Sequence, residues 1–419
     1  MEKIKIRLLD RQVGKYEKWR KRMYRNTFVE ININNLQDNV KNIKNYFNDY
    51  KYYFGVVKGN AYGHDIHIID YLIESGINYL AVSSLEEALK LREVNKDIPV
   101  LCLEPIDLEY LDICIKNKIT IVIHDYEYYK ELITKSINDH LIVHIKLDTG
   151  MNRLGIKDKQ QVTEIYNYLI NNNNIFLEGI FTHLATTGIS DKYWDEQVRK
   201  FKYLTQDIDL NKVPIIHMAR SIAFLDHPKI DICNGIRIGI AMYGYDPNPI
   251  QRNDLKSKLR KIKAKMRIKK YNISTAIDKS PIELKPAFSL YSEIIQMKNV
   301  KKGEFVGYGA GYIAQEDMIV GTIPIGYDDG IFRKSKGRAV VINKKRYNLI
   351  GDIGMGMVSV KLDESVKLHD KVILIGEGIS LKEVSDHNGT IIYESMCNIK
   401  NTVPRVFKKD NEIIKIQEY

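Results

Sequence analysis

The sequence predicts an α/β chain in which a closed (β/α)8 barrel of the TIM type is followed by a mainly β C-terminal domain. Between about residues 50 and 240, short apolar or β-branched runs alternate with amphipathic segments, as in βα units on a parallel sheet. Eight such runs can be counted, which is the number that closes this kind of barrel. From about residue 285, runs rich in Thr, Val, Ile and Gly follow one another without long helical segments.

The eight expected barrel strands lie at residues 52–57, 79–82, 99–103, 119–123, 142–147, 176–181, 213–216 and 230–236. Between them, Ser84 is a typical N-cap for a helix that continues to Val94, with glutamates in the first turn. Active sites of such barrels lie at the carboxyl ends of the strands, although loops that follow strands are polar in general. The polar residues expected there are Lys58, Ser83, Glu104, His124, Lys146, Asp148, His183, His217 and Arg237.

In the second half, strands are expected within residues 288–298, 318–327, 338–343 and 371–376, where Gly and Asp turns separate the runs. The resulting domain organisation is an N-terminal extension at 1–24, the barrel at 25–247, a basic insertion or linker at 248–284 and the β-rich domain at 285–419.

The net charge does not point to nucleic acid. The chain of 419 residues carries 64 Lys and Arg against 53 Asp and Glu, a formal charge of +11. Most of the excess lies between Arg252 and Lys279, where there are 11 basic residues and 2 acidic ones. Its central run, KSKLRKIKAKMRIKK (256–270), lacks interleaved aromatic residues and any recognised nucleic-acid module, so we interpret it as a solvated basic surface.

The remaining composition predicts a cytoplasmic globular protein. Hydrophobic residues make up 44% and charged residues 28%, which suffices for a full core. The 4 cysteines are widely spaced and form no CxxC pair, so neither a metal site nor a disulfide framework is indicated. No apolar run reaches the length of about 18 residues that suggests a membrane span, and the charged N-terminus lacks the apolar core of a signal peptide.

Lys58 is the first residue with a specific chemical prediction. It follows an apolar strand and precedes the run GNAYGHD. Burial at the barrel mouth would lower the pKa of its amine and make it a nucleophile that can form a Schiff base with an aldehyde cofactor. The ordinary alternative is a loop lysine whose amine extends into solvent.

The run VVKGNAYGHD (residues 56–65) resembles the pyridoxal 5'-phosphate (PLP) signature of the alanine racemases, a family that depends on this cofactor. Further motifs along nearly the whole chain are similar to those of the same family. The other matching runs, in chain order, are VEININNLQDNV (29–40), IKLDTGMNRLG (145–155), GIFTHLAT (179–186), HMARSIA (217–223), GIRIGIAMYG (235–244), VGYGAGY (306–312), IPIGYDDG (323–330), IGDIGMGM (350–357) and YESMCNIKNTVPRVF (393–407). Each motif alone is weak or moderate evidence, but their common order on a barrel followed by a β domain is highly specific.

The resemblance implies a two-base racemase in which Lys58 carries the cofactor and acts as one base, and Tyr308 of the partner subunit acts as the other. It implies that Arg237 faces the pyridine nitrogen, where a permanent cation would make the ring a weaker electron sink. It also implies that His183 lies between the tyrosine and Arg237. The phosphate would be held by Tyr62, Ser221, Tyr393 and the backbone amides of Gly239 and Ile240.

The substrate residues implied by the resemblance are Arg153, Tyr327 and Met355. Arg153 would contact the substrate carboxylate and the cofactor's phenolic oxygen, and Tyr327 would narrow the entry. Lys146 matches a lysine that is carbamylated in some members to hold this arginine. The implied assembly is a head-to-tail homodimer with shared active sites.

Three positions depart from the family's usual pattern. Gly356 stands where aspartate is usual, Arg220 where asparagine is usual, and Gly307 where serine is commoner. The basic insertion is also unusual. We interpret these changes as an enlarged or repolarised pocket.

The function expected from the sequence is interconversion of L-alanine and D-alanine, which supplies D-alanine for peptidoglycan. A serine or broad-specificity amino-acid racemase is the alternative. Serine racemases of the vancomycin-resistance type normally carry a membrane domain, PLP-binding regulatory proteins lack the second domain that holds Tyr308, and fold-related decarboxylases are not expected to combine the NAYGH and GYG motifs. A non-catalytic paralogue is the last alternative.

Overall fold

The computed structural model describes residues 23–185, 192–220, 229–246 and 282–418, together with residues 259, 262 and 266. The chain divides into two compact units. One, the barrel unit, contains residues 35–61 and the described part of 66–285. The other, the β unit, contains residues 23–34, 62–65 and 286–418.

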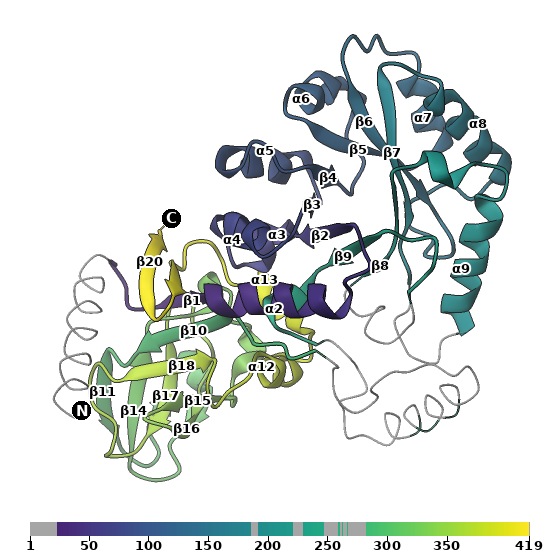
Figure 1. The fold of residues 1–419 in the computed structure, drawn as a ribbon. Helices are drawn as coiled ribbons and strands as arrows, with labels where there is room; N and C mark the ends of the chain where they lie inside the picture. The colour runs from purple at the N-terminus through teal and green to yellow at the C-terminus, as the bar shows by residue number, and fades with distance from the viewer. Residues whose placement is uncertain are drawn as a thin grey trace. The chain divides into compact units, whose positions relative to one another are not determined.

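In the barrel unit, eight strands among the described residues close in sequential order. They are β2 (Tyr52–Val56), β3 (Tyr79–Val82), β4 (Val100–Cys102), β5 (Ile119–Ile123), β6 (Leu141–Leu147), β7 (Ile175–Thr182), β8 (Ile215–Arg220) and β9 (Gly235–Ile238). Neighbouring strands are parallel, and β9 pairs with β2 to complete the barrel (Figure 1). The predicted (β/α)8 barrel is therefore confirmed.

Helix α2 precedes the first barrel strand, and helices and helical turns occupy the connections between the barrel strands. Their bounds are α2 (Ile33–Tyr46), α3 (Lys58–Tyr62), α4 (Ile69–Glu74), α5 (Leu85–Val94), α6 (Leu111–Lys116), α7 (Tyr126–Leu132), α8 (Lys159–Ile170) and α9 (Lys192–Leu204). Polar side chains cap several of them, since the first amides of a helix have no partner within it. Ser84 accepts from the amide of Glu87, as the sequence predicts, and Asp125 and Asp158 cap α7 and α8 in the same way.

The last two barrel strands begin later than expected. The predicted strands at 213–216 and 230–236 correspond to β8 at Ile215–Arg220 and β9 at Gly235–Ile238. Pro214 has no amide hydrogen to donate, and residues 230–233 turn, with the Cys233 amide bonded to the Ile230 carbonyl at 2.8 Å. His217 and Arg237 therefore lie within strands rather than after them.

The β unit contains a ten-stranded sheet in the order β11-β14-β17-β16-β15-β18-β10-β1-β19-β20 (Figure 1). Its strands are β1 (Phe28–Asn32), β10 (Phe288–Glu293), β11 (Gln296–Val300), β14 (Met318–Ile323), β15 (Ala339–Ile342), β16 (Lys345–Ile350), β17 (Val358–Leu362), β18 (Lys371–Ile375), β19 (Arg405–Lys409) and β20 (Glu412–Gln417). The separate pair β12 (Phe305–Val306) and β13 (Tyr312–Ile313) and the helices α12 (Leu381–Asn388) and α13 (Ile392–Cys397) complete it. The expectation of a mainly β second domain is confirmed.

Strand β1 belongs to the β unit although it comes first in the chain. It pairs antiparallel with β10 and parallel with β19, so residues from both ends of the sequence share one sheet. Phe28, Tyr291 and Val406 form a buried cluster at this junction. The barrel unit thus begins later than the expected barrel range of 25–247. The reason is that β1 pairs with strands from the far end of the chain and so belongs to the sheet of the β unit. The expected extension at 1–24 and insertion at 248–284 lie almost entirely outside the described residues.

Arg405 is a buried centre of the β unit. Its side chain is 1% exposed, and burial lowers its pKa to about 10. The guanidinium donates to four backbone carbonyl oxygens, those of Gly63, Ile399, Lys400 and Val403, at 2.5 to 3.1 Å. It therefore fixes the segment before β19 against residues 62–65.

We expect Arg405→Met to lower the melting temperature of the protein by roughly 5 °C or more, because it leaves buried carbonyls without donors. Differential scanning calorimetry measures this change. The matched control is Arg346→Met, which removes an exposed arginine paired with Glu383. Equal melting temperatures for the two variants would contradict the role given to Arg405.

Candidate functional site

Lys58 stands directly after β2, at the start of an unusual backbone turn. Gly59, Asn60 and Ala61 all have left-handed backbone angles, with φ between 50° and 64°. Such a conformation costs about 1 to 2 kcal/mol for each residue that has a side chain. The Glu87 carboxylate stabilises the turn by accepting from the amides of Gly59 and Ser83 at 2.6 and 2.8 Å.

The side chain of Lys58 is exposed, so the expectation of a buried lysine is wrong for the chain as described. Only Lys58 and Gly59 are exposed here: Asn60 is half-buried and burial resumes at Ala61, so Lys58 begins a short surface loop. The predicted position after the first barrel strand is nevertheless the one observed.

Lys146 is the buried lysine of the barrel. It lies in β6, is 5% exposed, and has a pKa lowered to about 8. Burial is the largest cause, followed by the positive charges of Arg153, Arg237 and Lys58, while Asp148 acts in the opposite direction. Three cationic groups therefore lie within electrostatic reach of Lys146, which favours an anionic ligand.

Arg153 is held by a loop that follows β6. The buried carboxylate of Asp148 accepts from the amides of Gly150 and Asn152 at 2.9 and 3.1 Å. The Asp148 amide donates to the carbonyl oxygen of Ile156, and the Ile156 amide donates to that of Lys146. These two bonds close the loop. Arg153 itself is exposed, so it is available to a ligand.

Arg237 is 3% exposed and lies inside β9. Its Nη2 donates to the carbonyl oxygens of Thr182 and Met218 at 2.9 and 3.0 Å and lies 3.4 Å from Nδ1 of His183. Its Nη1 lies 2.5 Å from Nδ1 of His217. The structure thus brings together two residues expected at the site, Arg237 and His183, and fixes the orientation of the guanidinium.

His217 is a core residue that the sequence placed too close to the surface. Its ring is stacked between Phe54 and Phe181, with centroid distances of 4.7 and 4.6 Å. Burial, Arg237 and His144 hold its pKa well below the usual range, so the imidazole is neutral. Knowing the strand register would have revealed this, since His217 then falls in the middle of β8.

The expected phosphate residues divide between the two units. In the barrel unit, Gly239 and Ile240 follow β9 and are buried, and the Tyr243 hydroxyl donates to the Val56 carbonyl oxygen at 3.0 Å. In the β unit, the rings of Tyr62 and Tyr393 lie 6.0 Å apart. Ser221 and the side chain of Arg220 lie outside the described residues.

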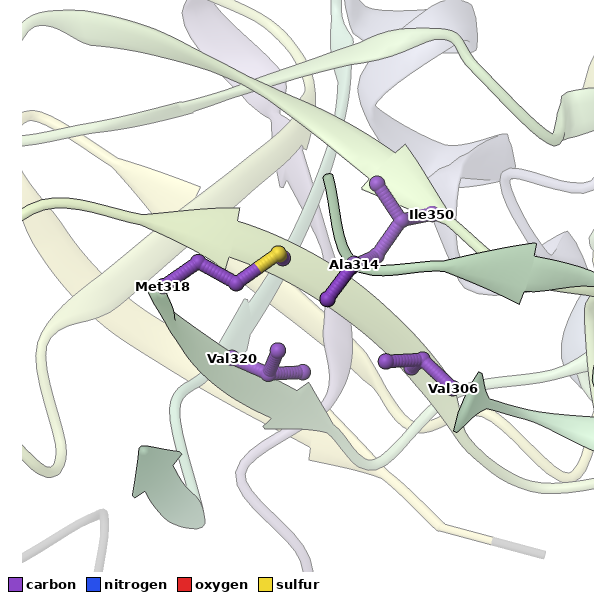
Figure 2. Close-up of a cluster of buried hydrophobic side chains, with 5 residues drawn as sticks. All are labelled: Val306, Ala314, Met318, Val320 and Ile350. Carbon is purple, nitrogen blue, oxygen red and sulfur yellow. The ribbon is translucent and has the colours of Figure 1, made fainter. Parts of the chain in front are cut away.

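Tyr308 is 76% exposed and lies in the hairpin between β12 and β13. Beneath this hairpin, five buried side chains contributed by several strands and loops form a hydrophobic cluster, shown in Figure 2: Val306, Ala314, Met318, Val320 and Ile350. Lys336 adds a polar anchor, because its Nζ donates to the Gly311 carbonyl oxygen and to Asp352 at 2.7 and 2.9 Å. Tyr308 is therefore presented outward from a packed base.

The structure brings the other expected β-unit residues near Tyr308. The Tyr327 amide donates to the Gly354 carbonyl oxygen at 3.0 Å, and the Asp328 amide donates to that of Met355 at 2.9 Å. A Cβ built at Gly354 would lie 3.6 Å from the Tyr308 ring. Tyr308, Tyr327 and Met355 thus belong to one exposed surface.

Two of the three departures from the family pattern have a visible structural setting. A Cβ built at Gly356 meets no atom within 4 Å, so there is room for a side chain at this position. Gly307 has φ of 81°, a backbone conformation in which serine would be strained.

Neither a cluster able to hold a metal ion nor a membrane-spanning helix is found in the described part of the chain. Within it, no group of three or more His, Cys, Asp or Glu side chains is arranged to hold a metal ion. None of its helices is long and apolar enough to span a bilayer.

The fold and the site define a barrel protein that gathers cationic groups at the carboxyl ends of its strands and carries an additional β domain. Family profiles described as "Alanine racemase, N-terminal domain" and "Alanine racemase, C-terminal domain" match residues 31–247 and 287–407. The chain belongs to the alanine racemase family, and it is therefore an enzyme of the isomerase class.

Individual relatives agree over nearly the full length. Alanine racemase 1 of Bacillus subtilis (strain 168) is 34% identical over 403 residues, covering 95% of this chain and 97% of the relative. The alanine racemase of Streptococcus gordonii is 36% identical over 361 residues, covering 85% and 90%. The crystal structure of alanine racemase from Bacillus anthracis with bound L-Ala-P has a TM-score of 0.83 at 31% identity and covers 95% and 98%.

The lowered pKa of Lys146 has a measurable consequence for stability. Its amine titrates near pH 8 when folded and near its ordinary value of 10.5 when unfolded. Between these two pH values the unfolded chain binds more protons than the folded chain, so the free energy of unfolding rises with pH. Below about pH 8 the folded protein carries the full cost of burying the Lys146 charge. We expect Lys146→Met to raise the melting temperature above that of the wild type, and to raise it more at pH 7 than at pH 9.5. Calorimetry in carbon dioxide-free buffer tests this, and a pH-independent gap would contradict it.

Proposed function

We propose that this chain is a PLP-dependent racemase that interconverts L-alanine and D-alanine. The observation that carries the proposal is the cationic cluster around Lys146 at the barrel mouth, beside a lysine that directly follows the first barrel strand. PLP carries a phosphate and a phenolic oxygen, and an amino acid carries a carboxylate, so the donor set fits both. Membership of the alanine racemase family supports the choice of alanine.

Each expected site residue has a role in this proposal. Lys58 would hold the cofactor, and Arg237 with its neighbour His183 would face the cofactor ring. The residues that would hold the phosphate are Tyr62, Ser221, Tyr393 and the backbone amides of Gly239 and Ile240.

Arg153 would bind the substrate carboxylate, while Tyr327 and Met355 would border the entry. The lowered pKa of Lys146 favours the neutral amine, which is the form that adds carbon dioxide. A carbamate at Lys146 would pair with Arg153 and hold it in place.

The bound cofactor supplies an electron-withdrawing ring that makes the α-proton of the amino acid acidic. The chain itself must then move that proton between the two faces of the α-carbon. We assign the Lys58 amine to one face and the Tyr308 phenol to the other. A phenol has an ordinary pKa near 10, so cationic neighbours must favour its ionised form during the reaction.

The second base would come from a partner subunit, which makes the enzyme a homodimer with shared sites. Tyr308 stands on a surface with several exposed apolar side chains: Phe305, Ile313, Met355 and Met357 are each 46% to 64% exposed. An apolar surface of this kind marks an interaction site, and a second copy of the chain is the occupant that would also use Tyr308. We further propose that the enzyme works in the cytoplasm and supplies D-alanine for peptidoglycan, as the resemblance to the family suggests.

Mixing two inactive variants tests the shared site. Lys58→Ala and Tyr308→Phe should each lose nearly all racemase activity. A hybrid dimer carries both changes in one site and neither in the other, so co-expression should restore about a quarter of the wild-type activity. D-alanine formation from L-alanine is the readout. Failure of the mixture to regain activity, with hybrid dimers confirmed by mass spectrometry, would exclude bases from different chains.

A serine or broad-specificity racemase is the second candidate function, because Gly356 leaves open space where the family usually has aspartate. The purified protein with PLP is incubated in heavy water with L-alanine or L-serine, and deuterated D-isomers are measured by chiral chromatography. If the space sets specificity, Gly356→Asp should lower kcat/KM for serine about tenfold or more relative to alanine, since such pocket changes are worth about 1 to 3 kcal/mol. An unchanged ratio would remove Gly356 as the determinant.

A further inference from the structure

A chain of hydrogen bonds crosses the interior of the barrel from Arg237. Nη1 of Arg237 lies 2.5 Å from Nδ1 of His217, and Nε2 of His217 lies 3.1 Å from Nδ1 of His144. Nε2 of His144 lies 3.0 Å from Oε2 of Glu178, which also accepts from the Tyr79 hydroxyl at 2.6 Å. We call these five residues the relay. They come from five barrel strands, β9, β8, β6, β7 and β3.

The bonding partners give the relay one direction. A guanidinium can only donate, so Nδ1 of His217 accepts and the proton of its neutral ring lies on Nε2. This proton is donated to Nδ1 of His144, which leaves the His144 proton on Nε2, facing Glu178. Each imidazole is thus restricted to a single tautomer, and the three bonds from Arg237 through the two histidines all lead to the carboxylate of Glu178.

The two acidic groups at the far end have the protonation states that this direction requires. Burial raises the pKa of Glu178, but the bonds from His144 and Tyr79 outweigh it, so the net pKa is lowered and the carboxylate is ionised. Burial and the neighbouring Glu178 raise the pKa of Tyr79 well above 10, so the phenol keeps its proton and donates it. Its own oxygen is bonded to Thr120 at 2.8 Å.

The barrel backbone is adapted to this arrangement. The pairing of β6 with β7 shifts register after Val143, which leaves Glu178 without an opposite residue in β6. Such an irregularity redirects a side chain. At the next residue, a Cβ built on Gly179 would lie only 2.5 Å from Cε1 of His144, so only glycine leaves room for the ring.

We propose that Glu178 is a positioning residue which, through the fixed tautomers of His144 and His217, orients the Arg237 guanidinium as a donor toward the ligand site. The role of Arg237 toward the cofactor rests on the proposed function. The assignment of the histidine tautomers does not, because it follows from hydrogen bonds within the protein. Without the carboxylate, either ring can adopt the opposite tautomer. His217 would then present an N–H to the arginine, and two donors would face each other.

The tautomers can be measured in the apo protein by NMR of selectively 15N-labelled histidine, with the two rings assigned through His144→Gln and His217→Gln. In the wild type, both rings should be neutral with the proton on Nε2. Glu178→Met removes the acceptor and should produce a second tautomer at both rings, whereas Glu178→Gln retains an acceptor oxygen and should preserve the wild-type pattern. Protonated rings or Nδ1–H tautomers in the wild type would overturn the proposal, and this holds even if Glu178→Met does not fold.

Kinetics supply the second arm. With PLP and L-alanine, Glu178→Met should lower kcat about 10- to 100-fold, the range seen when an outer partner that orients a directly acting group is removed. Glu178→Gln should recover most of this loss. The matched control, Glu164→Met, removes an exposed glutamate that is likewise bonded by a tyrosine, Tyr126, and should leave both spectra and rate unchanged.

The two arms distinguish the two proposals. A wild-type protein that shows the Nε2–H tautomers but does not racemise alanine would contradict the proposed function alone. An active enzyme whose histidine spectra do not respond to Glu178→Met would contradict the relay alone.

Discussion

Arg237 takes a permanent positive charge into the interior of a barrel, where removing it from water is costly. The surrounding structure offsets that cost with two backbone carbonyls, those of Thr182 and Met218, and with the imidazole of His217. A neutral imidazole that accepts from arginine must pass its own proton to another acceptor. The polar character of the barrel core, which continues through His144 to Glu178, follows from this one requirement.

The aromatic packing of the core is related to the same requirement, because it encloses the imidazole of His217. His217 is stacked between Phe54 and Phe181, and Phe54 is also stacked on Tyr79 at 4.3 Å. Flat rings on both faces exclude water from the imidazole and leave only its two nitrogens for bonding. The low dielectric environment then strengthens each hydrogen bond and makes any unpaired group expensive. The barrel therefore holds the arginine in a single orientation.

At the mouth of the barrel, local features are held in states that a free chain would avoid. Lys146 is buried among positive charges, which lowers its pKa to about 8, and the segment after Lys58 adopts left-handed backbone angles. Bonds from Glu87 and the loop closed by Asp148 compensate within the protein. Backbone strain and clustered charge of this kind concentrate at functional sites.

By itself the sequence determined the local features of this protein: the eight βα units, the β-rich second half, the cap at Ser84 and the motifs that identify the family. These depend on periodicity and on short-range residue types, which are visible along the chain. Only the tertiary structure decided which strands share a sheet, how deep each polar residue lies and which groups meet. β1 joined a sheet built mainly from the other end of the chain, the late start of β8 and β9 took His217 and Arg237 inside, and a register shift turned Glu178 toward His144. The physical reason is that a one-residue change of register exchanges the faces of a strand. Which strands pair, and where a pairing shifts by one residue, depends on segments that are distant in the sequence.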